Sequence, residues 1–68
     1  MKTEFSKRLY DLRTDKTLTQ SQLAEKIEVT QKAIDFWEKS INEPKASYII
    51  KLAEFFNVTT DYLLGLEN

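Results

Sequence analysis

Apolar residues recur along the chain with the spacing of α-helices, and their pattern predicts five helices. Phe5, Leu9 and Leu12 stand at positions i, i+4 and i+7, which form one face of a helix over about 3–14. The same periodicity predicts further helices over about 19–27, 31–39, 46–56 and 60–64. Signals for β-hairpins are missing, since the chain has one Gly and one Pro. The sequence therefore predicts an all-α, compact five-helix domain over 1–68.

Capping residues fix most of the expected helix boundaries. Thr19 and Gln22 have the spacing of a capping box, and Thr30 and Thr59 are good N-caps for the helices that follow them. Pro44 forces a loop before the helix over 46–56, and Gly65 closes the last helix. Two helices of about eight residues, joined by a short turn at 28–30, form a helix-turn-helix pattern over 19–39.

The inward-facing positions of these helices form the expected core. A chain of 68 residues buries roughly 60% of its unfolded surface and has no disulfide, so its stability depends on close helix packing or on a partner chain. The expected core residues are Phe5, Leu9, Leu12, Leu23, Ile27, Val29, Ile34, Trp37, Ile49, Leu52, Ala53, Phe56 and Leu63.

Composition excludes most catalytic and metal chemistry. The chain has neither Cys nor His, which removes thiolate and imidazole metal ligands and His-dependent catalysis. The acidic residues are scattered singly, without the spacing of a metal-binding loop. We therefore expect no enzyme activity, no cofactor and no metal. The sequence shows neither an apolar run of membrane-spanning length nor a signal peptide, so a cytoplasmic location without a membrane is expected.

Charge gives weak guidance about partners. The net charge is −1, from 10 basic and 11 acidic residues. Residues 1–45 carry nine bases and eight acids, a net of +1, whereas residues 46–68 carry one base and three acids, a net of −2. Non-specific affinity for nucleic acid comes from neutralised phosphates, so this balance predicts that such affinity is weak.

Segments along nearly the whole chain resemble the phage repressor/Cro-like helix-turn-helix family. The segments that carry the resemblance are Leu12-Arg13, Leu18-Thr19-Gln20, Leu23-Ala24, Val29-Thr30-Gln31, Ile34, Trp37-Glu38, Pro44, Lys51-Leu52-Ala53, Val58-Thr59 and Tyr62-Leu63-Leu64. The resemblance implies a five-helix repressor-like domain that binds a double-stranded DNA operator as a dimer, and no cofactor. It predicts a sequence-specific transcription regulator, most simply a repressor, with no evident small-molecule effector.

In such a protein the helix over 31–39 enters the major groove. Gln31, Lys32 and Phe36 then read bases, since they lie outside the inner stripe and match adenine, guanine and a thymine methyl. The alternative for Phe36 is folding back onto Ile41. The expected contacts to the DNA backbone are Thr19, Gln20, Thr30 and Lys39.

The resemblance also implies a structural ion pair between Arg13 and Glu38.

The chain departs from the usual pattern of the family in two ways. Thr17, Glu28 and Ser40 stand where the family usually has Gly, so either a residue with a side chain adopts φ > 0 there or the turns are built differently. The residues after the helix over 31–39 are not basic, which weakens the expected contact with phosphates. An alternative function is therefore a protein-interaction module, such as an antitoxin-like partner.

Apolar residues beyond the core predict a homodimer. The expected interface residues, on the last helix and one flank of the helix before it, are Tyr48, Phe55, Tyr62, Leu64 and Leu66. A monomer would leave this apolar surface in water, which small soluble proteins rarely do. The alternative is that Tyr48 and Phe55 pack on the last helix within one chain.

Overall fold

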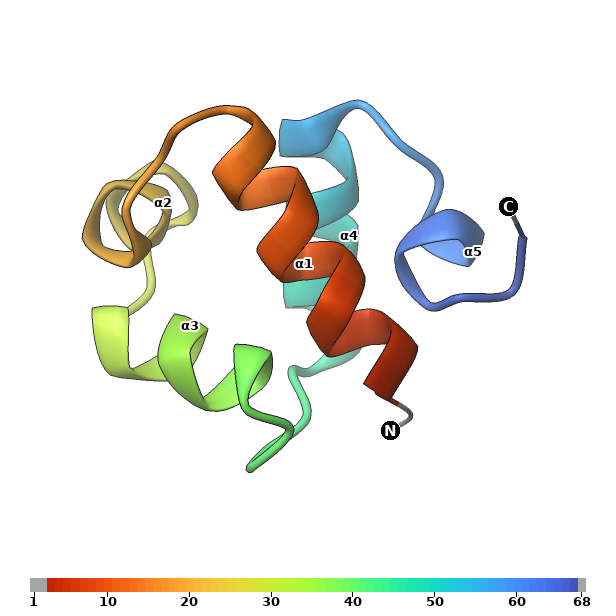
Figure 1. Cartoon of the computed structure of the whole chain (residues 1–68), viewed down its shortest axis with the longest axis horizontal. Coiled ribbons are helices and arrows are strands. Elements are labelled where there is room, and N and C mark those ends of the chain that lie inside the picture. The colour runs from red at the N-terminus through yellow and green to blue at the C-terminus, as the bar shows by residue number, and fades with distance from the viewer. Residues whose placement is uncertain (1–2, 68) are drawn as a thin grey trace.

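Five helices make up the computed structural model, which describes residues 3–67 (Figure 1). Residues 1, 2 and 68 of the expected domain lie outside the described range. The helices are α1 (Thr3–Asp15), α2 (Gln20–Ile27), α3 (Gln31–Glu38), α4 (Ala46–Phe56) and α5 (Thr60–Leu63). Between residues 3 and 67 there is no strand, so the all-α, five-helix prediction is confirmed. None of these helices is long and apolar enough to cross a membrane.

Helix α1 runs through the middle of the fold, between two groups of shorter elements. Figure 1 shows α2 and α3 on one side of α1, α5 on the other, and α4 behind it. Helix α3 packs against both α1 and α2, and α5 packs against α1 and α4. The helix-turn-helix pair therefore forms one side of the molecule and leaves its outer surface open.

Side-chain caps start three of the helices as the sequence predicts. The Thr19 hydroxyl accepts a hydrogen bond from the Gln22 N–H at 3.0 Å, and the Gln22 side chain accepts one from the Thr19 N–H at 2.9 Å. The hydroxyl groups of Thr30 and Thr59 cap α3 and α5 in the same way, at 3.1 and 2.9 Å. These bonds satisfy N–H groups that a helix start leaves without partners, and they fix where each short helix begins.

Four turns use a left-handed residue with a side chain. Thr17, Glu28 and Ser40 have φ of 56°, 63° and 59°. The family that the chain resembles usually has Gly at these three positions, and the backbone here keeps the left-handed conformation that favours Gly. Asn57 ends α4 with φ of 57°. Asn tolerates this conformation better than most residues, whereas a left-handed Thr, Glu or Ser carries strain of about 1–2 kcal/mol.

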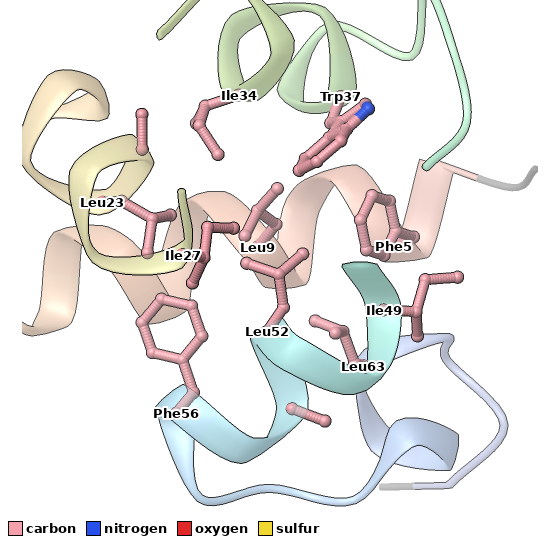
Figure 2. Packing of buried hydrophobic residues seen from close by; sticks show 12 residues of the cluster. Phe5, Leu9, Leu23, Ile27, Ile34, Trp37, Ile49, Leu52, Phe56 and Leu63 are labelled. Atoms are coloured by element: carbon pink, nitrogen blue, oxygen red, sulfur yellow. The ribbon is translucent and has the colours of Figure 1, made fainter. Parts of the chain in front are cut away.

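The core contains eleven of the thirteen expected residues, together with Ala24. Figure 2 shows Ile34 and Trp37 extending from α3 towards Leu9 and Phe5 of α1. Leu12 and Val29 differ from the expectation, because they are only partly buried at the edge of the cluster. Val29 lies in the turn between α2 and α3, and Leu12 lies towards the C-terminal end of α1.

Two polar side chains of α1 attach other parts of the chain, and neither contact was predicted. The Ser6 hydroxyl is buried and donates to the Trp37 carbonyl oxygen at 2.6 Å, beside the end of α3. Arg8 donates to the carbonyl oxygens of Tyr62 and Glu67 at 2.7 and 2.6 Å, and its guanidinium lies 4.3 Å from the centre of the Tyr62 ring. Arg8 therefore holds α5 and the segment after it against α1.

The strained turn at Thr17 gives a test of this backbone. Thr17→Gly should raise the free energy of unfolding by about 0.5–1 kcal/mol, because the relief of left-handed strain exceeds the extra entropy that Gly loses on folding. Asn57→Gly is the matched control and should change it by much less. Urea denaturation followed by Trp37 fluorescence measures both, and a lower midpoint for Thr17→Gly would contradict the assignment of strain.

Candidate nucleic-acid interface

The first residues of α2 and α3 lie side by side on the outer surface of the helix-turn-helix pair. Gln20 begins α2 and Gln31 begins α3, and the Gln31 side-chain amide donates a hydrogen bond to the Gln20 side-chain oxygen. The Gln20 amide nitrogen in turn donates to Asp35 Oδ1 at 3.2 Å and to Glu38 Oε1 at 3.1 Å. One side chain of α2 is thus fixed at three points along α3.

A bidentate ion pair holds α3 to α1. Arg13 Nε lies 2.6 Å from Glu38 Oε2, and Arg13 Nη2 lies 2.9 Å from Glu38 Oε1. The remaining Arg13 nitrogen donates to the Leu18 carbonyl oxygen at 2.7 Å, in the loop before α2. The Arg13 and Glu38 side chains are 10% and 6% exposed, so this is a buried pair that the sequence located correctly.

The electrostatics of the pair favour the charged state of its arginine. The hydrogen bond to Glu38 raises the pKa of Arg13 above its ordinary value, against the opposing effect of burial. A guanidinium stays protonated throughout the ordinary pH range, so Arg13 remains a cation in this contact. The pair contributes no net charge to the surface of α3.

The expected base-reading residues lie along the exposed side of α3. Gln31 and Lys32 are exposed, and Phe36 is partly buried. Lys32 Nζ lies 5.6 Å from the centre of the Phe36 ring, so the ammonium and the aromatic face form one surface. The alternative for Phe36 is packing on Ile41. Ile41 donates its N–H to the Phe36 carbonyl oxygen at 2.9 Å, and Ile41 itself is 60% exposed. Base contact by Phe36 stays a prediction.

The expected backbone-contacting residues surround this surface. Thr19 and Thr30 are exposed at the N-termini of α2 and α3, where helix N–H groups and the helix dipole favour an anion such as phosphate. The Lys39 side chain is 62% exposed at the end of α3, and its Nζ lies 3.0 Å from Asp35 Oδ2. Lys39 is thus paired with an acid that sequence reasoning did not assign to the site.

Asp35 is the functional candidate that the sequence analysis missed. Its hydrogen bonds with Lys39 and then with Gln20 lower the pKa of the Asp35 carboxyl below its ordinary value. The spacing of Asp35 and Lys39 at i and i+4 on one helix is a sequence signal that could have identified the pair. The contact with Gln20 crosses from one helix to another, and no spacing in the sequence predicts it.

The expected dimer surface is partly covered within the chain. Tyr48 packs on Trp37 with ring centres 5.7 Å apart, and Phe55 packs edge-on against Phe56 at 5.0 Å. Tyr62 covers Arg8, and Leu64 packs against the core. Leu66 alone of the five expected residues is largely exposed, at 72%.

A helix-turn-helix family model matches residues 9–63, which is most of the chain and includes every helix of this interface. The chain belongs to this helix-turn-helix family. The relatives named below are transcriptional regulators, and the family is one of DNA-binding regulators rather than enzymes. The prediction of a repressor-like helix-turn-helix fold is confirmed.

Relatives of this helix-turn-helix chain include longer regulators. It is 44% identical over 64 residues to the HTH-type transcriptional activator BcrR of Enterococcus faecalis. The matched segment covers 94% of this chain and 31% of that protein. It is 36% identical to the HTH-type transcriptional regulator ImmR of Bacillus subtilis, over 87% of this chain and 46% of that protein. The chain thus spans less than half the length of both relatives.

A solved structure agrees with the whole helical arrangement. The P22 c2 repressor protein, solved in complex with a synthetic operator, superposes with a TM-score of 0.86 and 27% sequence identity. The match covers 93% of this chain and 96% of that one. The five helices therefore share their arrangement with a protein whose structure contains operator DNA.

The buried ion pair gives a test of how α3 is held. Arg13→Ala should lower the free energy of unfolding by about 3–5 kcal/mol, because it leaves the Glu38 carboxylate buried without its partner. Replacing both residues, Arg13→Met with Glu38→Leu, should cost much less, since no buried charge is then left unpaired. Chemical denaturation measures both variants. A loss of about 1 kcal/mol or less for Arg13→Ala is the value of an exposed pair and would contradict the burial.

Proposed function

We propose that this chain is a sequence-specific, DNA-binding transcription regulator that places α3 in the major groove of a two-fold operator, most simply as a repressor. One observation carries the proposal. The polar starts of α2 and α3 are fixed side by side and face outwards, in a fold that superposes on a repressor solved with its operator. Such a regulator works in the cytoplasm, where it reaches DNA without a membrane or a cofactor.

Each base-reading residue has a chemical match in the major groove. The Gln31 amide can donate to and accept from adenine, and Lys32 can donate to the guanine acceptors. The Phe36 ring, next to Lys32, offers an apolar surface to a thymine methyl group. Because the hydrogen bond to Gln20 orients the Gln31 side chain, less conformational freedom is lost when it meets a base.

Backbone contacts come from the residues around these three. The N–H groups at the starts of α2 and α3, beside Thr19 and Thr30, suit phosphates on either side of the groove. The Gln20 amide already donates to Asp35 and Glu38, so it reaches a phosphate by exchanging one of these bonds. Lys39 adds a cation directly after the end of α3. Contacts of this kind set the position of α3 and carry no sequence information by themselves.

We also propose a homodimer, because a helix of eight residues contacts too few bases to define an operator alone. Two copies related by a two-fold axis can place both α3 helices in successive major grooves, roughly 34 Å apart. Leu66 would be central to the interface, with Tyr48, Phe55, Tyr62 and Leu64 around it, since its side chain is the most exposed of the five. Burying these apolar side chains would drive the association.

A protein-interaction module is the second candidate function. The net charge of −1 favours it, as does the absence of basic residues at 40–42, directly after Lys39. Such a module would use the same outer surface for a protein and would select no DNA sequence. A single set of DNA-binding measurements separates the two candidates.

Selection from a random DNA pool should yield a palindromic sequence, and binding to it should weaken steeply with salt, because phosphate neutralisation releases counterions. Lys39→Ala should weaken binding to all sequences alike and reduce the salt slope by about 1 per protomer. Lys26→Ala is the control, because Lys26 is exposed at the opposite end of α2 from Gln20. Fluorescence anisotropy measures each constant, and failure to enrich any sequence would support the protein-interaction module instead.

The dimer has its own test in solution. Leu66→Asp should shift the sedimentation of the chain at micromolar concentration from dimer to monomer, because it places a charge in a surface that must lose its water. Ile41→Asp is the control, since Ile41 is an exposed apolar residue in the loop after α3, outside the proposed interface. If the unmodified chain sediments as a monomer both alone and with the selected duplex, this interface is wrong.

A further inference from the structure

The carboxylate of Asp35 lies on the proposed DNA-reading surface with no assigned task. Asp35 lies three residues after Lys32 and four after Gln31, so the three side chains share one side of α3. Its side chain is 25% exposed, so part of it is open to a ligand in front of α3. An acid at this place is unexpected on a surface that approaches phosphates, because its charge opposes the approach.

The two oxygens of Asp35 are fixed but not saturated. Oδ1 accepts a hydrogen bond from the Gln20 side chain at 3.2 Å, and Oδ2 lies 3.0 Å from Lys39 Nζ. An ionised carboxylate has about four acceptor positions, so roughly two stay available. Both bonds lower the pKa of the Asp35 carboxyl, which keeps it an acceptor and not a donor near neutral pH.

An ionised carboxylate discriminates between the groups that bases present in the major groove. Cytosine offers its N4 amino group and adenine its N6 amino group, and both are donors that a carboxylate can accept. Guanine and thymine offer acceptor oxygens at the corresponding edge, which a carboxylate repels. An acid on this surface can therefore reject one class of base as well as attract the other.

We propose that Asp35 is a specificity-determining residue that requires a base with an exocyclic amino group, with cytosine as the first match, at one position of each half-site. This inference rests on the proposed function, because it assigns a selective contact to the same α3 surface. Gln20 and Lys39 hold the carboxylate in place, so its position is set before DNA arrives. The contact is attractive for cytosine or adenine and repulsive for guanine and thymine.

The same carboxylate limits binding to DNA of any sequence. Its ion pair with Lys39 competes with the contact between Lys39 and a phosphate, and so weakens that contact without abolishing it. Removing the charge of Asp35 frees Lys39 for that contact, so affinity for unrelated DNA should rise while discrimination falls. A merely structural role would act through Gln20 on the base contact of Gln31, so a loss of preference confined to one other position distinguishes direct base contact by Asp35.

The experiment compares the unmodified chain with Asp35→Asn, which keeps the shape of the side chain and removes its charge. The unmodified chain first selects its sequence from a random pool, and single base-pair changes in that duplex are then measured by anisotropy. At one position per half-site, replacing the amino-bearing base should weaken binding of the unmodified chain roughly 5- to 100-fold. Asp35→Asn should reduce that factor to about 2 or less at this position only, and should bind unrelated DNA several-fold more tightly.

Glu25→Gln is the matched control. It removes one negative charge from an exposed residue of α2, and it should change neither the base preference nor the ranking of the variant duplexes. Asp35→Ala repeats the test with a side chain that can neither accept nor donate a hydrogen bond. Circular dichroism establishes that each variant is folded before its binding is compared.

The outcomes separate this inference from the function on which it rests. If the unmodified chain enriches no sequence, the proposed function is wrong and the role of Asp35 is wrong with it. If the chain selects a sequence and both Asp35 variants keep every base preference, the regulator stands and Asp35 is not a specificity determinant. Loss of preference at one position, with tighter binding to unrelated DNA, supports the inference.

Discussion

The buried ion pair of Arg13 with Glu38 is the contact on which the arrangement of the outer surface depends. Helix α3 has eight residues, too few to be stable alone in water, and its buried apolar residues are Ile34 and Trp37. The pair fixes its C-terminal half against α1, and Arg13 also binds the loop before α2 through the Leu18 carbonyl oxygen. Without this tie, the packing of Ile34 and Trp37 and the hydrogen bond from Ser6 to the Trp37 carbonyl oxygen would have to hold α3 against α1.

The same tie extends to the exposed surface through hydrogen bonds. Glu38 accepts from Gln20, and Gln20 connects to Asp35 and Gln31, so a buried charge pair orients the polar side chains in front of α3. Buried ion pairs contribute little net stability, because the cost of desolvation offsets their attraction. The value of this network therefore lies in geometry, since it holds donors and acceptors at fixed positions before a ligand binds.

Sequence reasoning succeeded where the signal is local and failed where long polar side chains cross between helices. The capping box at Thr19 depends on neighbouring residues, and the sequence contains that information. For Glu28 the sequence left two kinds of turn open, and the structure shows the left-handed one. The hydrogen bonds of Gln20 and the attachment of the last residues by Arg8 join segments whose spacing is set by packing, so no sequence period reports them. The Arg13–Glu38 pair was found only because the chain resembles a known family. Val29 was misplaced because turn residues lack a helical phase.

The central claim is that the outer side of the helix-turn-helix pair, oriented by this network, is the surface that meets DNA. Nuclear magnetic resonance of the isotope-labelled chain, titrated with its selected duplex, tests the claim at individual residues. The largest chemical-shift changes should fall on the first turns of α2 and α3 and on the side-chain amides of Gln20 and Gln31. Changes centred on α1 and α5, with the starts of α2 and α3 unaffected, would contradict it.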